Sequence, residues 1–164
     1  MDLLREAQQL KNVPMFARLD APKLKLLAFT SQRLSFDAGE ELFHLGDAAD
    51  CAYVIVEGEV DVLADIDAGE IVVTTLGKNQ LCGEMAVLSN YPRSATVRAK
   101  GRVQALRISD EAFLRLLSEN PEVALDVMRQ LSDKIAQSQR QFEELQDRLQ
   151  RLEAKMAGNG HDQG

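Results

Sequence analysis

The sequence predicts a mainly β protein of the α+β class: a β-roll, or jelly roll, with short N-terminal helices and a long C-terminal helix. Three patterns support this fold. Short β-type runs alternate with glycine-containing turns between residues 34 and 108. Apolar residues before this region have helical spacing, and those after it follow a heptad spacing. Many short strands with regular turns are typical of a sandwich or jelly roll.

Two short helices are predicted before the β region. The spacing of Leu3, Leu4, Ala7 and Leu10 predicts the first over residues 2–10. The second is expected to begin at Asp20, because aspartate suits an N-cap and Pro22 suits a first helical turn. Its buried stripe would be Leu24, Leu27 and Ala28.

Within the β region, runs rich in β-branched and apolar residues predict five strands. They cover residues 52–56, 60–63, 71–76, 96–99 and 103–108. Gly39, Gly46, Gly58 and Gly77 fall at predicted turns, where we expect a positive φ that glycine adopts at little cost.

The chain becomes helical again after residue 108. Ser109 or Asp110 can cap a helix that carries Phe113, Leu116 and Leu117, and Asn120-Pro121 should end it, since the residue before proline avoids helical geometry. A much longer helix is predicted from about Pro121 to Met156. The division expected from these patterns is a β-roll domain with flanking helices at 1–130, a coiled-coil-like helix at 121–157 and a disordered tail at 158–164.

The long helix carries an apolar heptad seam with one polar member. The seam consists of Leu131, Ile135, Ser138, Phe142, Leu145, Leu149, Leu152 and Met156, with steps that alternate between four and three. Sustained a/d spacing indicates a coiled coil. Homodimerisation through this helix is the simplest way to cover the seam.

Composition excludes several classes of function. The net charge of −7 argues against broad or direct nucleic-acid binding, which needs clustered Lys and Arg. Apolar runs are too short for a membrane span, and the N-terminus does not resemble a secretory signal. Cys51 and Cys82 have small or apolar neighbours, which predicts core thiols in a reducing compartment and a cytoplasmic protein.

Catalytic and metal-binding constellations are not evident. His44 and His161 are the only histidines, and neither a nucleophile–base set nor a clustered metal-ligand set accompanies them. We therefore expect no enzyme activity and no bound metal.

Residues 83–97 carry the most specific pattern in the chain. Gly83 and Glu84 open a short helix-like run, Asn90 and Pro92 form a turn, and Arg93 leads into a β-branched segment. Free amides at a helix start favour an anion, and a guanidinium grips phosphate oxygens in a fixed fork. A carboxylate can accept a hydrogen bond from a ribose hydroxyl. The segment thus suits a phosphorylated ribonucleotide.

This segment resembles the phosphate-binding cassette of cyclic-nucleotide-binding domains, which occur in catabolite-activator-type regulators, kinase regulatory subunits and nucleotide-gated channels. The resemblance implies that Glu84 bonds the ribose 2′-hydroxyl and that Arg93 pairs with the cyclic phosphate. Gly83 would let the backbone approach the ligand. The remaining cassette residues would line the pocket: Met85 and Ala86 through backbone amides or walls, and Ser94 and Ala95 beside the phosphate or the base edge.

The resemblance also implies that the long helix covers the base. By similarity, Ser138 and Gln139 stand where bacterial relatives place polar residues against adenine. Alternatively, Ser138 only weakens or registers the coiled coil. The ligand implied is cAMP, with cGMP as the alternative because the Ser94 hydroxyl could serve the guanine 2-amino group.

The function predicted is a cyclic-nucleotide sensor that signals through its C-terminal helix to an effector protein. Two alternatives stay open: a coiled-coil scaffold with a vestigial nucleotide pocket, and the sensor fragment of a longer transcription regulator. Nothing in the chain resembles a basic recognition helix.

Overall fold

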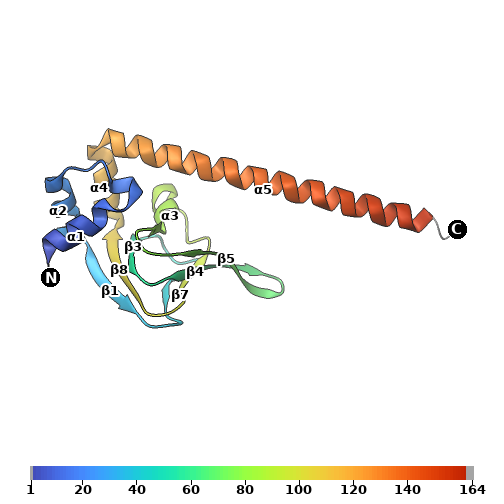
Figure 1. Ribbon diagram of the computed structural model, residues 1–164, viewed down its shortest axis with the longest axis horizontal. Helices are drawn as coiled ribbons and strands as arrows, with labels where there is room; N and C mark the ends of the chain where they lie inside the picture. The colour runs from blue at the N-terminus through green and yellow to red at the C-terminus, as the bar shows by residue number, and fades with distance from the viewer. Residues whose placement is uncertain (1, 162–164) are drawn as a thin grey trace. The chain divides into compact units, whose positions relative to one another are not determined.

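The computed structural model describes residues 2–161 and divides into two compact units, one up to Ala124 and one from Leu125 (Figure 1). Among the described residues, the first unit contains every strand and five helical elements. The second consists of the long helix α5 beyond its first turn. Each unit is described by itself.

Three helical elements open the first unit: α1 (Leu3–Lys11), the 3₁₀ turn η1 (Pro14–Phe16) and α2 (Ala21–Thr30). The predicted start of α2 is confirmed, because the Asp20 carboxylate accepts a hydrogen bond of 3.1 Å from the Lys23 amide. The predicted buried stripe is confirmed as well; it consists of Leu24, Leu27 and Ala28.

Eight strands form two antiparallel sheets of four strands each, as the β-roll prediction requires. One sheet has the order β1 (Gln32–Phe36), β8 (Val103–Ser109), β3 (Cys51–Glu57), β6 (Leu81–Cys82). The other has the order β2 (Glu41–Phe43), β7 (Thr96–Ala99), β4 (Val60–Ile66), β5 (Gly69–Leu76). All five predicted runs are strands. The sequence patterns do not single out β1, β2 and β6, because these strands have little apolar alternation or only a few residues.

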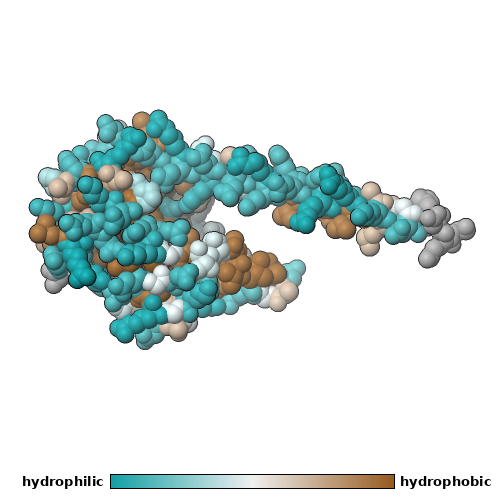
Figure 2. All heavy atoms as spheres, viewed as in Figure 1, coloured by the Kyte–Doolittle hydropathy of each residue, from teal (hydrophilic) through white to brown (hydrophobic). Residues whose placement is uncertain are grey.

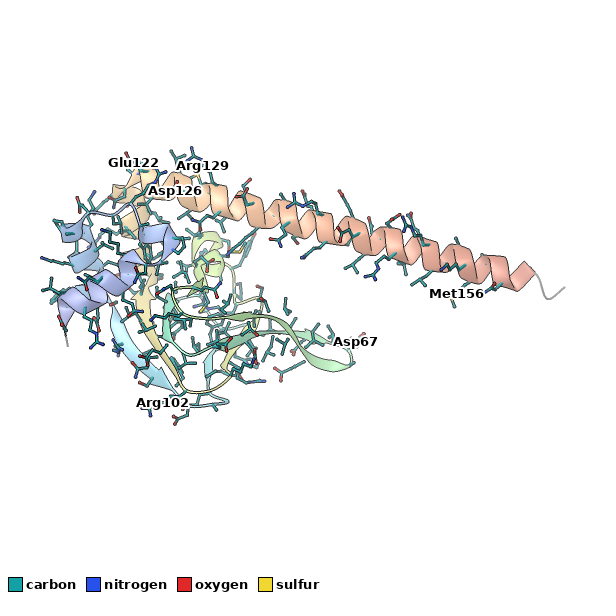
Figure 3. All side chains as sticks on the ribbon, in the orientation of Figure 1. Asp67, Arg102, Glu122, Asp126, Arg129 and Met156 are labelled. Carbon is teal, nitrogen blue, oxygen red and sulfur yellow. The ribbon has the colours of Figure 1, made fainter. Side chains whose placement is uncertain are left out.

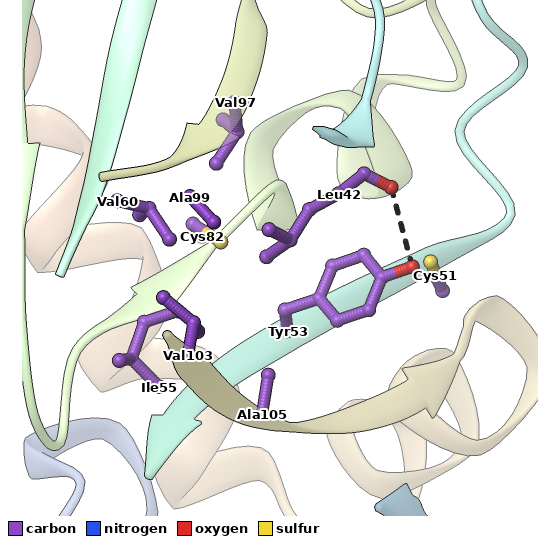
Figure 4. Close-up of a cluster of buried hydrophobic side chains, with 10 residues drawn as sticks. All are labelled: Leu42, Cys51, Tyr53, Ile55, Val60, Cys82, Val97, Ala99, Val103 and Ala105. Atoms are coloured by element: carbon purple, nitrogen blue, oxygen red, sulfur yellow. Dashed lines mark hydrogen bonds between the residues drawn. The ribbon is translucent and has the colours of Figure 1, made fainter. Parts of the chain in front are cut away.

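A hydrophobic core joins residues from both sheets (Figure 4). Tyr53 lies at its centre, and its hydroxyl donates a hydrogen bond of 3.4 Å to the Leu42 carbonyl. Both thiols, Cys51 and Cys82, are free and buried in this core, so their predicted role as core residues is confirmed. The full set of buried members is Leu42, Cys51, Tyr53, Ile55, Val60, Cys82, Val97, Ala99, Val103 and Ala105.

The turn glycines follow the prediction with one exception. Gly39, Gly46 and Gly58 have φ values of 87°, 89° and 86°. Gly77 is not left-handed; in its turn the positive φ of 68° belongs to Asn79. Asparagine tolerates this conformation better than most residues because its short side chain can hydrogen-bond locally, so a glycine in a turn did not by itself identify the left-handed position.

The helix α4 (Asp110–Glu119) begins and ends as the sequence predicts. The Ser109 hydroxyl caps it by accepting a hydrogen bond of 3.2 Å from the Ala112 amide. Asn120 interrupts it with φ −132° and ψ 82°, and α5 (Pro121–His161) follows. Proline suits this first position because its missing N–H would have no intrahelical partner there.

The long helix α5 has 41 residues and continues through residues 158–161, so the first part of the predicted tail is helical. Residues 162–164 of that predicted tail lie outside the described residues. Local ion pairs support the helix, among them Arg129 with Asp126 at 3.5 Å (Figure 3). No helix among residues 2–161 is long and apolar enough to cross a membrane.

The apolar seam of α5 is exposed from Ile135 onwards. Apolar side chains recur among hydrophilic ones on this helix in Figure 2. Between 54% and 76% of the residue surface is exposed at its outer members, which are Ile135, Phe142, Leu145, Leu149, Leu152 and Met156. Met128, which is 62% exposed and three residues before Leu131, extends the seam by one step at its start.

Candidate functional site

The segment 83–95 folds as a short helix between two left-handed residues. Gly83 has φ 84° and precedes α3 (Glu84–Ser89), and Asn90 ends that helix with φ 55°. The Tyr91 amide donates to the Ala86 carbonyl at 3.2 Å and closes the turn. The helix-like run and the turn at Asn90 therefore form as the sequence predicts.

Arg93 is buried, with 2% of its surface exposed, and the groups that contact its guanidinium are neutral. One terminal nitrogen, Nη1, donates to the Gly83 carbonyl at 2.8 Å, and the other, Nη2, donates to the Cys51 carbonyl. The guanidinium carbon lies 4.0 Å from the centre of the Phe43 ring. The third nitrogen, Nε, is buried without a hydrogen-bond partner among the described residues.

The backbone of Arg93 is held by the loop that follows β2. The Gly46 amide donates to the Arg93 carbonyl, and the Arg93 amide donates to the Asp47 carbonyl, both at 2.8 Å. Nearby, the Leu45 amide donates to the hydroxyl of Thr96 at 2.9 Å. These bonds fix the arginine at its backbone as well as at its head group.

Only glycine fits at position 83. A Cβ atom there would lie 2.6 Å from Nη1 of Arg93 and 3.0 Å from the ring of Phe43. The positive φ independently disfavours any residue with a side chain. The backbone at Gly83 lies close to the arginine, and its approach to a ligand stays a prediction.

Glu84 is a second buried charge of the cassette, with 5% of its surface exposed. The pKa of the nearby Cys82 thiol is raised to about 12, mainly by burial; the negative charge of Glu84 contributes to the rise, and the positive charge of Arg93 opposes it. Both charged side chains thus act on the same thiol. Burial also raises the pKa of Cys51, so both thiols stay protonated at neutral pH.

The other predicted site residues have different surroundings. Met85 is 45% exposed, and Ala86 is partly buried. Ser94 is exposed and Ala95 partly buried, in the bend between Arg93 and β7. The structure thus gathers the predicted cassette residues in one segment and brings Gly83 and Arg93 into contact.

Ser138 and Gln139 lie on α5 in the second unit, where both are exposed. Their contact with a nucleotide base stays a prediction.

Sequence reasoning missed the residues that hold the arginine, above all Phe43 and Cys51. Phe43 is one apolar residue of a short strand, and Cys51 acts mainly through its backbone carbonyl. Neither feature has a sequence signal. The turn glycine Gly46 was predicted, but not that its amide binds Arg93.

Two further features lie elsewhere in the first unit. A groove of about 230 Å³ between α2 and α4 shares no residue with the cassette. On the surface, Nδ1 of His44 lies 2.9 Å from a carboxylate oxygen of Glu41. This hydrogen bond raises the pKa of His44 and lowers the pKa of Glu41. Among residues 2–161 there is no cluster of three or more His, Cys, Asp or Glu side chains that could hold a metal ion.

A jelly roll in which a buried arginine bonds to the glycine before a short helix defines a class of nucleotide-binding domain, and comparison with known proteins identifies the family. Residues 33–120, more than half of the chain, match the family model described as cyclic nucleotide-binding domain. The chain belongs to this family, which confirms the resemblance drawn from residues 83–97.

Relatives of known type include kinase regulatory subunits. The cAMP-dependent protein kinase type II regulatory subunit of Drosophila melanogaster is 39% identical over 125 residues, which cover 76% of this chain and 32% of the relative. The cAMP-dependent protein kinase regulatory subunit of Mycosarcoma maydis is 34% identical over 113 residues, which cover 66% of this chain and 22% of the relative. The chain thus matches a third or less of the length of these relatives.

Solved structures share the fold. The sensor domain of the transcriptional regulator DNR from Pseudomonas aeruginosa superposes with a TM-score of 0.75 at 27% identity, covering 84% of this chain and 93% of that one. A mutant regulatory subunit of a cAMP-independent protein kinase A from Trypanosoma brucei, bound to cAMP in its A site, superposes with a TM-score of 0.69 at 29% identity. The match covers 79% of this chain and 48% of that one.

Proposed function

We propose that this protein is a regulatory sensor that binds cAMP through the cassette at residues 83–95. The observation that carries the proposal is the state of Arg93: a buried cation with neutral partners and one donor, Nε, without a partner. Burying a charge is costly unless it is paired. A cyclic phosphate would supply both the counter-charge and the missing acceptor.

The neighbouring residues suit the rest of the ligand. We assign the ribose 2′-hydroxyl to the carboxylate of Glu84 and the close backbone approach to Gly83. Met85, Ser94 and the other cassette residues would line the phosphate and the base edge. cAMP is favoured over cGMP because both kinase relatives are named cAMP-dependent and the Trypanosoma brucei structure contains cAMP.

Calorimetric titration of the whole chain with cAMP and with cGMP tests this function. Binding of cAMP, tighter than that of cGMP, is expected. No binding of either nucleotide at millimolar concentration would leave the scaffold with a vestigial pocket as the better account. Glu84→Ala should reduce the preference for cAMP over its 2′-deoxy analogue; unchanged discrimination would refute the assigned ribose contact.

The signal is proposed to leave through α5, which pairs with the same helix of a second copy. Burial of the exposed seam, which has leucine at three of its four d positions, drives this pairing. Ligand binding would shift the orientation of α5 and the surface it offers to an effector protein. Amide exchange over residues 130–156 should therefore differ with and without cAMP, and equal protection would count against this coupling.

The charges beside the seam favour parallel over antiparallel pairing. The g positions are largely basic: Lys134, Gln141, Arg148 and Lys155. Antiparallel helices would oppose g with g and set these cations against one another. In a parallel pair, Arg148 of one copy faces the e-position Glu153 of the other, which is attractive.

Cysteine crosslinking tests the orientation. Met156→Cys should form a disulfide-linked dimer under mild oxidation, because a parallel pair brings the two copies of this a position together. The outward-facing variant Ala154→Cys is the matched control and should not crosslink. Background crosslinking through Cys51 and Cys82 should be low, since both thiols are buried. Failure of Met156→Cys to crosslink in a demonstrated dimer would exclude the parallel arrangement.

The free thiols suit a reducing compartment, so we place the protein in the cytoplasm. We further expect a regulatory role without catalysis, as in the kinase regulatory subunits it resembles.

A further inference from the structure

We propose that Phe43 is a positioning residue for the phosphate-binding arginine: its ring holds the Arg93 guanidinium in the plane from which it meets the nucleotide. This inference rests on the proposed function and adds a residue that lies outside the segment 83–95. It starts from the distance of 4.0 Å between the guanidinium carbon and the centre of the Phe43 ring.

The ring supplies the constraint that the hydrogen bonds leave open. Bonds to the Gly83 and Cys51 carbonyls hold the two terminal nitrogens of Arg93 at their edges. Two edge contacts still allow the guanidinium plane to tilt about the line that joins them. The ring of Phe43, over which the guanidinium carbon lies, opposes this movement, because cation–π attraction is strongest when the cation stays over the ring.

Phe43 is itself held in place. Its ring stacks on Tyr53, with centres 6.3 Å apart and planes at 24°. Phe36 packs edge-on against the same tyrosine, with centres 6.0 Å apart and planes at 82°. The ring of Phe43 also approaches position 83, where a Cβ would come within 3.0 Å. The arginine thus rests on an aromatic stack that continues into the core.

The charge of Arg93 stays available for a ligand. The two carbonyls and the ring are neutral, so these contacts stabilise the cation without cancelling its charge. Its Nε remains without a partner among the described residues. A guanidinium held in one orientation loses little further freedom when an anion binds, and such preorganisation strengthens binding.

The affinity of three variants for cAMP tests the proposal by calorimetry. Phe43→Leu removes the ring and should weaken binding about 3- to 30-fold, the range expected for a partly to fully desolvated cation–π contact. Phe43→Tyr keeps the ring and should restore affinity to within about twofold of the wild type. Phe36→Leu is the matched control, because it removes the other aromatic partner of Tyr53 but leaves the ring over Arg93, so its loss of affinity should be clearly smaller than that of Phe43→Leu.

Equal losses in Phe43→Leu and Phe36→Leu would mean that the ring acts only through core packing and would overturn the proposal. An unchanged affinity in Phe43→Leu would overturn it too. Should Phe43→Leu not fold, Phe43→Met takes its place, since the unbranched side chain adapts to the same space.

A readout without nucleotide separates this inference from the proposed function. The Nε–Hε resonance of Arg93, assigned by its loss in Arg93→Lys, should be displaced by the ring current of Phe43. The displacement should vanish in Phe43→Leu and persist in Phe36→Leu. If the wild-type protein binds no cAMP, the proposed function fails, but this measurement still decides whether Arg93 lies over the ring of Phe43. A resonance that is not displaced in the wild type would refute that contact.

Discussion

The cassette buries charged side chains, whereas the helix α5 exposes apolar ones. In the cassette, Arg93 and Glu84 are charged and buried, and the arginine keeps a donor without a partner. Along α5, apolar residues such as Leu145 and Met156 are exposed by more than half. A buried cation selects a small anion that can enter between side chains. An exposed apolar seam selects a long partner surface, which a second helix provides.

The largest effect is expected from removing the cation of the cassette. Arg93→Ala should weaken cAMP binding by roughly 30- to several-thousand-fold, since truncating one partner of a buried charge pair costs about 2–5 kcal/mol. Calorimetry measures this. Self-association, followed by analytical ultracentrifugation, should not change, because the seam is intact.

Arg98→Ala is the control for that variant. Arg98 is an arginine on β7, but it pairs with Glu70 at 3.0 Å on the surface. The Arg98→Ala variant should bind cAMP nearly as well as the wild type. Equal losses in the two arginine variants would show that general charge, and not the cassette, attracts the nucleotide.

Disruption of the seam should give the converse result. Leu145→Gln removes an apolar d position from both helices of a pair, and each buried leucine contributes about 1.5–3 kcal/mol. The dimer dissociation constant should rise at least about 100-fold, as measured by ultracentrifugation. Ala154→Gln, which lies off the seam, is the control and should dimerise as the wild type does. A wild-type protein that is monomeric would contradict this prediction.

A smaller effect is expected from Gly83→Ala. The added methyl group would collide with Arg93 and Phe43 and would require a left-handed alanine, which together should cost about 2–4 kcal/mol of stability. Denaturant unfolding measures this loss.

Gly39→Ala isolates the backbone contribution. Its φ of 87° matches that of Gly83, but a Cβ there meets nothing within 4 Å. It should cost only about 1–2 kcal/mol. Equal losses of stability in Gly83→Ala and Gly39→Ala would mean that the cassette accommodates the added methyl group without strain.

The smallest effect concerns pH. Because its hydrogen bond to Glu41 raises the pKa of His44, the folded state binds this proton more tightly than the unfolded state. The stabilisation is complete below the unfolded pKa of about 6.5 and is lost as the pH rises through the higher folded value. His44→Gln should therefore flatten a slight decline in melting temperature above pH 6.5. A decline of the same size in the variant would rule out this pair as its source.

Much of the fold could be predicted because its signals are local. Caps such as Asp20 and Ser109 act within one helical turn. The five strands with β-branched runs were also evident. By contrast, the short strand β2 forms through pairing with β7, which lies more than fifty residues further along the chain. No local pattern reports such a pairing.

The sequence by itself determined the class of site: Gly83, Glu84 and Arg93 in their order and spacing. It also determined the heptad seam of α5, since both depend on residues that are neighbours along the chain. The tertiary structure decided what holds the arginine. Phe43, Cys51 and the loop at Gly46 reach Arg93 only because β2, β3 and the cassette meet in the folded β-roll. Contacts between distant segments depend on how the sheets pack, and this packing is not encoded at any single position.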